Sequence, residues 1–324
     1  MVQMPSMNKG HVLRSQRSVR YATKPTPGTV AHPLRDFYMN MFMEDTSSGI
    51  LPIGTGKRKK GAKVELVPPS RSVERLVIEA ISRDLYGYRS DLTGAVAEFF
   101  RLCSATICAD DEATHEIVYL EDRQAEKEVA FELVPIPQEQ LIRRFGRTFQ
   151  IVSPEAASEL GVPSRIRLPD EGLLRFRAPV PFRNALRRMR RGLFRLGERP
   201  LIGMAMEVAE GKRQYDVHAH ERARRLALLD TVKVIGWTAR GDLRQNVLSF
   251  YWIQMEILFH RFKIELRDTI LATLNDGIAR AGKKIGFEGE LKICGMPTVR
   301  DTLEASEKLK SGQIAFTEVM DAFD

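Results

Sequence analysis

The sequence predicts an α+β protein in which a mixed α/β domain precedes long helices and a small helical C-terminal part. Apolar residues recur at helical spacing in several segments, short β-rich runs occupy the middle of the chain, and 43% of the 324 residues are hydrophobic. The predicted organisation is an arm at 1–62, a mixed domain at 63–208, helices at 209–286, and a strand with helices at 287–324.

The first 62 residues are predicted to form a basic, mostly extended arm with one short ordered patch near Leu34 to Met43. Residues 1–63 hold 11 Lys and Arg against 3 Asp and Glu, whereas the rest of the chain holds 39 of each sign. Lys57, Arg58, Lys59 and Lys60 form the most basic run. The arm is therefore expected either to contact an anionic partner or to serve as a solubilising tail.

The mixed domain is expected to begin with two helices. Ser70 or Ser72 can cap the first, whose apolar residues follow a 3.6-residue period as far as Leu85. Asp91 begins the second. Residues 116–120 and 129–134 flank a charged turn and predict a hairpin. The later elements expected here are a short helix at 138–143, strands at 147–152, 173–176 and 202–208, and a very basic helix at 183–196.

The second half of the chain is predicted to be mainly helical. The expected elements are helices at 217–234, 243–281, 299–310 and 315–322, a break at 236–241, and a strand at 291–293. In the long helix, apolar positions are dense from Val247 to Phe262 and wider than one amphipathic stripe. That width predicts contacts on more than one side, as in a helix buried in an oligomer or between domains.

Two motifs invite a catalytic interpretation, and each has a simpler one. Gly49 to Lys57 lacks the phosphate-loop pattern, because Arg58 stands where that motif needs a hydroxyl. His218 and His220 could share a zinc ion on a strand, but here they open a helix, where positions two apart diverge. Solvated histidines are preferred, and a metal-dependent hydrolase remains the enzymatic alternative.

Other reactive groups give no stronger candidate. Asp110 to Glu112 is expected to end a helix and stay hydrated. The three cysteines form neither an even disulfide set nor a CxxC pair, so Cys103 and Cys108 are expected to be buried thiols in a reducing compartment. No catalytic, cofactor or metal residue is predicted. Neither a membrane-spanning helix nor a secretory signal is expected.

The helix expected at 183–196 is unusually basic. Its arginines are Arg183, Arg187, Arg188, Arg190, Arg191 and Arg195. Because they cover most of the helix circumference, some are expected to face a partner. Ion pairs within or between subunits are favoured over DNA contact, since interleaved stacking aromatics are missing. The acidic segment 110–128 is one partner within the chain.

The order of elements over roughly 71–324 resembles that of bacteriophage portal proteins. Phe131-Glu-Leu-Val-Pro-Ile-Pro-Gln-Glu-Gln140 and Thr148-Phe-Gln-Ile-Val-Ser-Pro154 are similar to successive strands of the portal wing, and Leu173-Leu-Arg-Phe-Arg-Ala-Pro179 to the strand before the next wing helix. Leu309-Lys-Ser-Gly-Gln-Ile-Ala-Phe-Thr-Glu-Val-Met320 is similar to the portal ending. The segment between Val208 and Asp216 is too short for a full clip, so the clip is expected to be reduced.

The resemblance implies a structural, non-enzymatic subunit of a closed ring of twelve copies at a capsid vertex of the virion, assembled in the host cytoplasm. Double-stranded DNA would pass through the ring without sequence recognition, and the partners would be capsid protein, a head–tail adaptor and a terminase. A tunnel-like loop is expected at 236–246, where Arg240 and Arg244 would approach the DNA backbone or serve ion pairs between subunits. The candidates for the subunit interface are Arg187, Arg188, Arg191, Phe250, Trp252 and Phe259.

One further alternative belongs to a different class. A DNA-binding accessory protein would use the basic arm and the arginine-rich helix, and would bind duplex DNA as a monomer or dimer with a steep salt dependence.

Overall fold

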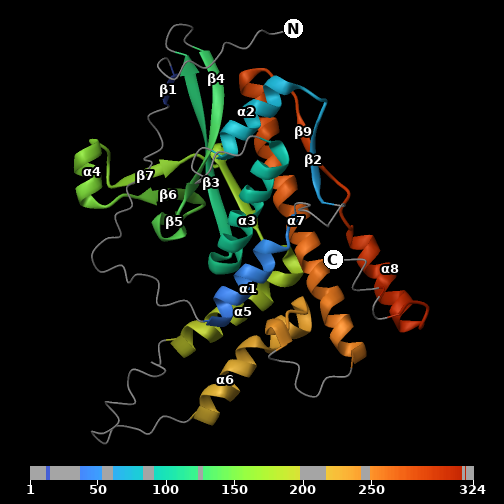
Figure 1. Ribbon diagram of the computed structural model, residues 1–324. Coiled ribbons are helices and arrows are strands. Elements are labelled where there is room, and N and C mark those ends of the chain that lie inside the picture. The colour runs from blue at the N-terminus through green and yellow to red at the C-terminus, as the bar shows by residue number, and fades with distance from the viewer. Residues whose placement is uncertain are drawn as a thin grey trace, which may run out of the picture. The chain divides into compact units, whose positions relative to one another are not determined.

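The computed structural model describes residues 12–14, 37–52, 61–82, 91–122, 127–197, 217–241, 249–315 and 318 (Figure 1). They form an α+β protein, as the sequence predicts. The chain divides into two compact units. Unit 1 comprises Met1–Thr29, Ile50–Arg177 and Arg267–Met296, and unit 2 comprises Val30–Gly49, Ala178–Leu266 and Pro297–Asp324.

The larger sheet of unit 1 is built around β3 (Glu112–Asp122). This strand pairs antiparallel with β4 (Lys127–Ile136), β8 (Leu173–Arg177) and β1 (Val12–Arg14). Val118 lies opposite Glu132 of β4, and His115 lies opposite Leu174 of β8. The hairpin predicted around residues 116–134 is therefore confirmed, and it forms the centre of the sheet.

Helices α2 (Arg71–Ser82) and α3 (Leu92–Asp110) supply much of the core of unit 1. Asp91 caps α3, because its carboxylate accepts a hydrogen bond from the Gly94 amide at 2.8 Å. Cys103 and Cys108 are buried, as predicted, and burial raises the pKa of the Cys103 thiol. Among the described helices, α3 alone has the length and composition to cross a membrane, but 61% of its apolar window is buried, as in the core helix of a globular domain.

A second, smaller sheet of unit 1 consists of β5 (Leu141–Arg144), β6 (Arg147–Ile151) and β7 (Arg165–Leu168), all antiparallel, with α4 (Pro154–Leu160) between β6 and β7. The helix predicted at 138–143 is wrong beyond its first turn. Only a 3₁₀ turn, η1 (Gln138–Gln140), forms before the chain enters β5. Residues 141–144 pair with β6 in a hairpin, and this pairing holds in an extended conformation a segment whose local propensity had predicted a helix.

Glu112 corrects the expectation that the acidic segment 110–112 stays hydrated. Asp111 does end α3 in a left-handed conformation, but the Glu112 side chain is buried between the guanidinium groups of Arg143 and Arg177. Burial opposes its ionisation, yet the hydrogen bond from Arg177 and the charges of both arginines outweigh that effect and lower the pKa of Glu112. The ion pair links β3, β5 and β8.

The second half of α7 (Ser249–Ile285) completes unit 1 from residue 267 onward. Its buried side chains include Ile270, Leu274 and Ile278. Asn275 exchanges two hydrogen bonds with the backbone of Leu291, at 2.8 and 3.0 Å. Leu291 belongs to β9 (Glu290–Cys294), which pairs antiparallel with β2 (Lys63–Val67).

Unit 2 is helical. It contains α1 (Phe37–Ser48), α5 (Val180–Gly197), α6 (Val217–Asp230), a π-helical turn η5 (Thr231–Ile235), a 3₁₀ turn η6 (Ala239–Gly241), the first half of α7, and α8 (Val299–Lys310). Gly192 of α5 lies so close to α6 that an added Cβ would stand 2.5 Å from the Cβ of Ala227. Thr298 begins α8 with a capping box.

An aromatic cluster forms the core of unit 2. Phe42 of α1 is fully buried and contacts Trp237 at 5.1 Å and Phe262 at 6.0 Å between ring centroids. Phe182 of α5 meets Phe262 edge-on at 5.1 Å. The ordered patch predicted near Leu34 to Met43 is thus a helix that contributes to the core.

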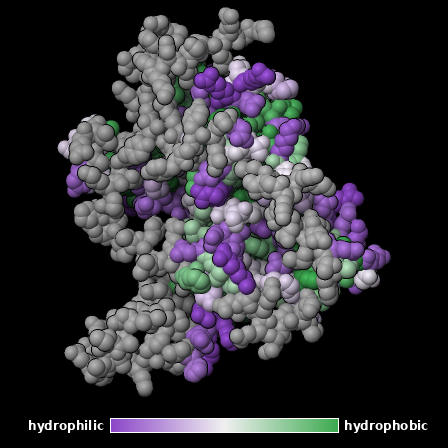
Figure 2. All heavy atoms as spheres, viewed as in Figure 1, coloured by the Kyte–Doolittle hydropathy of each residue, from purple (hydrophilic) through white to green (hydrophobic). Residues whose placement is uncertain are grey.

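The broad apolar surface of α7 is largely covered inside unit 2. Ile253 and Ile257 pack against Ala305 and Leu309 of α8, whereas Phe262 belongs to the aromatic cluster. Contacts on more than one side are confirmed, but elements of the same chain provide them. The width of this surface does not require a neighbouring copy. Apart from Leu303, the exposed side chains of α8 are charged, and Figure 2 shows hydrophilic residues in this region.

Candidate functional site

The turn at 236–241, which is the first part of the tunnel-like loop predicted at 236–246, is tightly fixed in unit 2. Gly236 ends the π-helical turn with φ of +84°, and its amide donates to the carbonyls of Thr231 and Val232 at 3.0 and 3.1 Å. A Cβ at Gly236 would meet the carbonyl oxygen of Met255 and stand 2.8 Å from the amide nitrogen of Phe259. Only glycine allows this approach to α7.

Two side chains of the turn bind α1. The Trp237 indole is 2% exposed, and its Nε1 donates to Oδ2 of Asp45 at 2.9 Å. Arg240 donates from Nε to Oδ1 of Asp45 at 2.8 Å and from Nη2 to Glu44 at 2.6 Å. These hydrogen bonds to Asp45 and Glu44 raise the pKa of Arg240. Asp45 therefore accepts from both ends of the turn.

The same turn contains two consecutive residues with left-handed backbone angles, Ala239 (φ 52°) and Arg240 (φ 53°). Such angles cost about 1–2 kcal/mol at each residue with a Cβ, and the contacts with α1 offset that cost. We call residues 236–241, held by Glu44 and Asp45, the anchored turn.

Arg240 was predicted to approach the DNA backbone or to pair with another subunit, but in the structure it pairs with Glu44 and Asp45 of its own chain. Its charge is balanced by two carboxylates of its own chain, which weakens its ability to bind phosphate. Contact between Arg240 and DNA stays a prediction, as does that of Arg244, which lies outside the described residues. The notable residues that the sequence did not point to are Glu44 and Asp45, because they are almost 200 positions away.

The arginine-rich helix α5 has a distinct buried face. Its buried residues are Ala185, Leu186, Met189 and Leu193. The prediction that the arginines cover most of the helix circumference is therefore wrong. Arg188 pairs with Asp230 of α6 at 2.6 Å, which is an ion pair within the subunit, although with a different partner from the acidic segment that was suggested. Arg187 and Arg191 are exposed.

The aromatic candidates for a subunit interface differ in exposure. Phe259 is 8% exposed and packs on Phe42, so its side chain belongs to the interior of unit 2 and not to an interface. Phe250 and Trp252 are partly buried against the α8 cluster. Leu226 and Leu229 of α6 were not among the predicted interface residues, yet they are 69% and 41% exposed. Three residues apart, they share one face of the helix.

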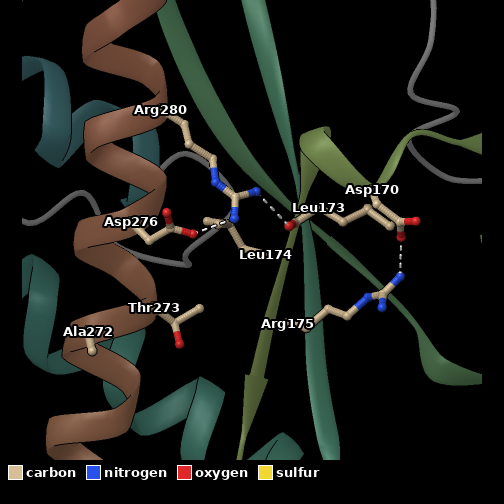
Figure 3. A pocket seen from close by; sticks show the side chains of 8 residues that line it. All are labelled: Asp170, Leu173, Leu174, Arg175, Ala272, Thr273, Asp276 and Arg280. Atoms are coloured by element: carbon tan, nitrogen blue, oxygen red, sulfur yellow. Dashed lines mark hydrogen bonds and ion pairs between the residues drawn. The ribbon is translucent and has the colours of Figure 1, made fainter.

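A shallow cavity of about 460 Å³ lies within unit 1 between β8 and α7 (Figure 3). Two ion pairs line it: Arg175 with Asp170, and Arg280 with Asp276, both at 2.5 Å. Arg280 also donates to the carbonyls of Glu171 and Leu173 at 3.2 Å. Arg280 therefore fastens α7 to η2 (Asp170–Gly172) and β8, whereas the pair of Arg175 with Asp170 joins β8 to η2. No predicted site residue lies here.

The remaining predicted residues form no site within the described part of the chain. His218 is exposed in the first turn of α6, and the side chain of His220 lies outside the described residues, as do Lys57, Arg58, Lys59 and Lys60 and the strand predicted at 202–208. Within the described part of the chain, no three His, Cys, Asp or Glu side chains could jointly hold a metal ion. Exposed Cys294 has Glu65 at 3.9 Å from its sulfur.

No family model matches this chain, and no curated protein matches it. The resemblance to portal proteins therefore depends on the sequence segments and the order of elements given above.

Proposed function

We propose that this protein is a structural ring subunit resembling a phage portal protein, which forms a DNA passage at a capsid vertex for genome packaging and ejection. Its partners would be further copies of itself, twelve in all as in the family, together with double-stranded DNA, capsid protein, a head–tail adaptor and a terminase. Its role would be passive.

The order of elements supports this proposal. A helix leads into a hairpin, a small sheet and a further strand in unit 1, and a 37-residue helix follows the anchored turn. The same order, with a wing followed by a tunnel loop and a channel helix, is what the resemblance implies.

The anchored turn is the observation that carries the proposal. A loop that meets sliding DNA needs a base that does not move with it, and Asp45 and Glu44 fix that base on α1. Within the proposal, Arg240 becomes an anchor, while Arg244 remains the candidate for electrostatic contact with the DNA backbone.

The exposed leucines of α6 support a neighbouring copy. Leu226 and Leu229 form an apolar pair that a solitary chain leaves in water. Two exposed leucines alone are not unusual, but α6 lies beside α5, whose exposed Arg187 and Arg191 are also candidates for contact between copies. We include all four residues in the proposed interface.

The test is electron microscopy with negative stain, together with mass photometry, on the purified full chain at several concentrations and salt levels. We expect closed rings with a mass near twelve times the 36.8 kDa of one chain. Leu226→Glu/Leu229→Glu should abolish the rings. Leu102→Glu, at a residue 38% exposed on α3, is the matched control and should leave them intact. A lone 36.8 kDa species under all conditions would refute the proposal.

The accessory-protein alternative has one supporting observation, the exposed arginines of α5. It predicts duplex binding by a monomer or dimer that is weakened by Arg187→Ala/Arg191→Ala, without any rings. The same mass measurement separates the two functions.

A further inference from the structure

The small sheet of unit 1, which lies next to α4 in Figure 1, has two faces whose side chains differ in burial and charge. Thr148 and Gln150 of β6 are buried, and the same face carries Leu168, which packs against Ile136 and Leu173 of the larger sheet. Because side chains alternate along a strand, the next residues lie on the other side. We call this other side the outer face, and its main residues are Ile142, Arg144, Arg147, Phe149, Arg165 and Arg167.

The outer face holds four positive charges and no negative one. None of the three strands contains Asp or Glu, and among the described residues none of the four arginines has a carboxylate partner. Arg144 lies directly opposite Arg147 in the hairpin register, where like charges repel. Arg143, by contrast, points to the inner side and pairs with Glu112. The unpaired set therefore suits an anionic partner.

Aromatic rings lie among these charges. The guanidinium of Arg165 stacks over the Phe149 ring at 3.9 Å. Phe145 forms the tip of the β5–β6 hairpin, is 92% exposed, and has the Arg144 guanidinium 5.6 Å from its ring centroid. It also adopts a left-handed φ of 50°, followed by Gly146 at 70°. Such angles in a two-residue turn favour Asn or Gly, not Phe.

We infer that the outer face and the Phe145 tip form a binding site for single-stranded nucleic acid. The four arginines would bind successive phosphates, since their planar guanidinium groups match phosphate oxygens. The exposed ring of Phe145 would stack on an unpaired base. The repulsion between Arg144 and Arg147 and the unfavourable conformation of Phe145 both destabilise the free protein, and both features serve this contact.

Single-stranded nucleic acid fits better than the other anionic partners. The carboxylates of an acidic peptide could pair with the arginines, but they supply no aromatic ring to stack on the exposed Phe145 side chain. Duplex DNA presents phosphates but keeps its bases stacked. This site does not depend on ring assembly or on the channel-facing residues of the proposed function, so each can fail without the other.

The experiment measures binding of a fluorescein-labelled 20-nucleotide oligo(dT) to the full chain by fluorescence anisotropy over a range of salt. Arg144→Ala/Arg167→Ala should reduce the slope of log K against log salt by about 1.4, because each lost phosphate contact removes about 0.7. Phe145→Asn should weaken binding roughly tenfold, while preserving or increasing thermal stability because Asn suits the turn. Duplex of the same length should bind more weakly.

Arg71→Ala/Lys283→Ala is the matched control, because it also removes two exposed positive charges from unit 1. It should change neither the slope nor the affinity appreciably at physiological salt. Three results would each overturn the inference: an equal loss in the control, unchanged binding by Phe145→Asn, or competition by polyglutamate as effective as that by unlabelled oligo(dT).

Discussion

His115 shows how a single buried side chain makes the stability of unit 1 depend on pH. Its ring lies between Phe99 and Phe176, at 5.2 and 5.3 Å between centroids, and its Nδ1 is buried without a hydrogen-bond partner among the described residues. Burial lowers the pKa of His115 to about 4. The folded state therefore keeps this histidine neutral over a range in which the unfolded chain binds a proton.

The sign of the effect follows from this difference. Above pH 6.5 both states are neutral and the stability is complete; as the pH falls from 6.5 towards 4, the unfolded state alone gains a proton, and about 3 kcal/mol is lost. His115→Phe should remove about 2 kcal/mol of the stability difference between pH 7.5 and 5.0, measured by urea denaturation. His260, whose pKa is lowered to about 3 by burial and by Lys263, remains in both proteins. An unchanged pH dependence would contradict this assignment.

Asp45 is the second residue with a specific expectation. Asp45→Ala leaves the buried Trp237 N–H without its acceptor and should cost about 2 kcal/mol of unfolding free energy. Asp45→Asn retains an acceptor oxygen and should cost less. Glu44→Ala, which removes only an exposed ion pair with Arg240, should cost at most about 1 kcal/mol. Denaturant titrations of the three variants test the order, and equal losses would exclude a special role for Asp45.

For single residues, the sequence predicted features that depend on neighbouring positions, but it did not predict contacts between residues far apart in the chain. The Asp91 cap and the buried Cys103 and Cys108 follow from residues nearby in the chain. The burial of Glu112 depends on Arg143 and Arg177, which are 31 and 65 positions away. No local pattern indicates such pairs, because only the folded sheet brings them together.

Among the elements, the turn before α7 depends most on one residue. Gly236→Ala imposes strain at φ +84° and a clash with the backbone of Met255 and Phe259. We expect a loss of at least about 3 kcal/mol, measured by thermal or denaturant unfolding. Gly312 also has a positive φ, of +69°, but open space around it, so Gly312→Ala should cost only about 1–2 kcal/mol. Equal costs would show that the close contact with α7 is unimportant.

Elements with strong periodicity were predicted well, and those decided by tertiary contacts were not. The helix at 299–310 and the hairpin agree with α8 and with β3–β4. The long helix begins at Ser249 and ends at Ile285, against a predicted span of 243–281. Its apolar width correctly indicated several contacts, but periodicity cannot distinguish α1 and α8 of the same chain from another subunit.

At the scale of the whole molecule, part of the predicted arm belongs to the core, although its composition did not indicate this. Residues 1–62 were predicted as one arm, yet α1 within them supplies fully buried Phe42. A chain that starts at residue 37 should keep unit 2 folded. A chain that starts at residue 49 should lose more than the roughly 3–5 kcal/mol expected for Phe42→Ala alone. Thermal unfolding of the two truncated chains tests this, and equal stability would show that α1 is dispensable.

The fold class was predicted from the sequence, but the composition of the units was not. The four predicted segments are continuous, whereas each unit collects three separate stretches of chain. β9 joins unit 1 through its pairing with β2, while α8, a few residues later, joins unit 2. Domain boundaries predicted from linker composition cannot reveal that separate segments of the chain come back to the same unit.

The close approach of α5 and α6 at Gly192 has a practical consequence. With no side chain at Gly192, the backbones of the two helices pack closely at this point, and this contact sets the spacing between the guanidinium groups on one helix and the leucines on the other. A single bulky substitution at position 192 would act as a wedge and alter that spacing without changing any surface residue.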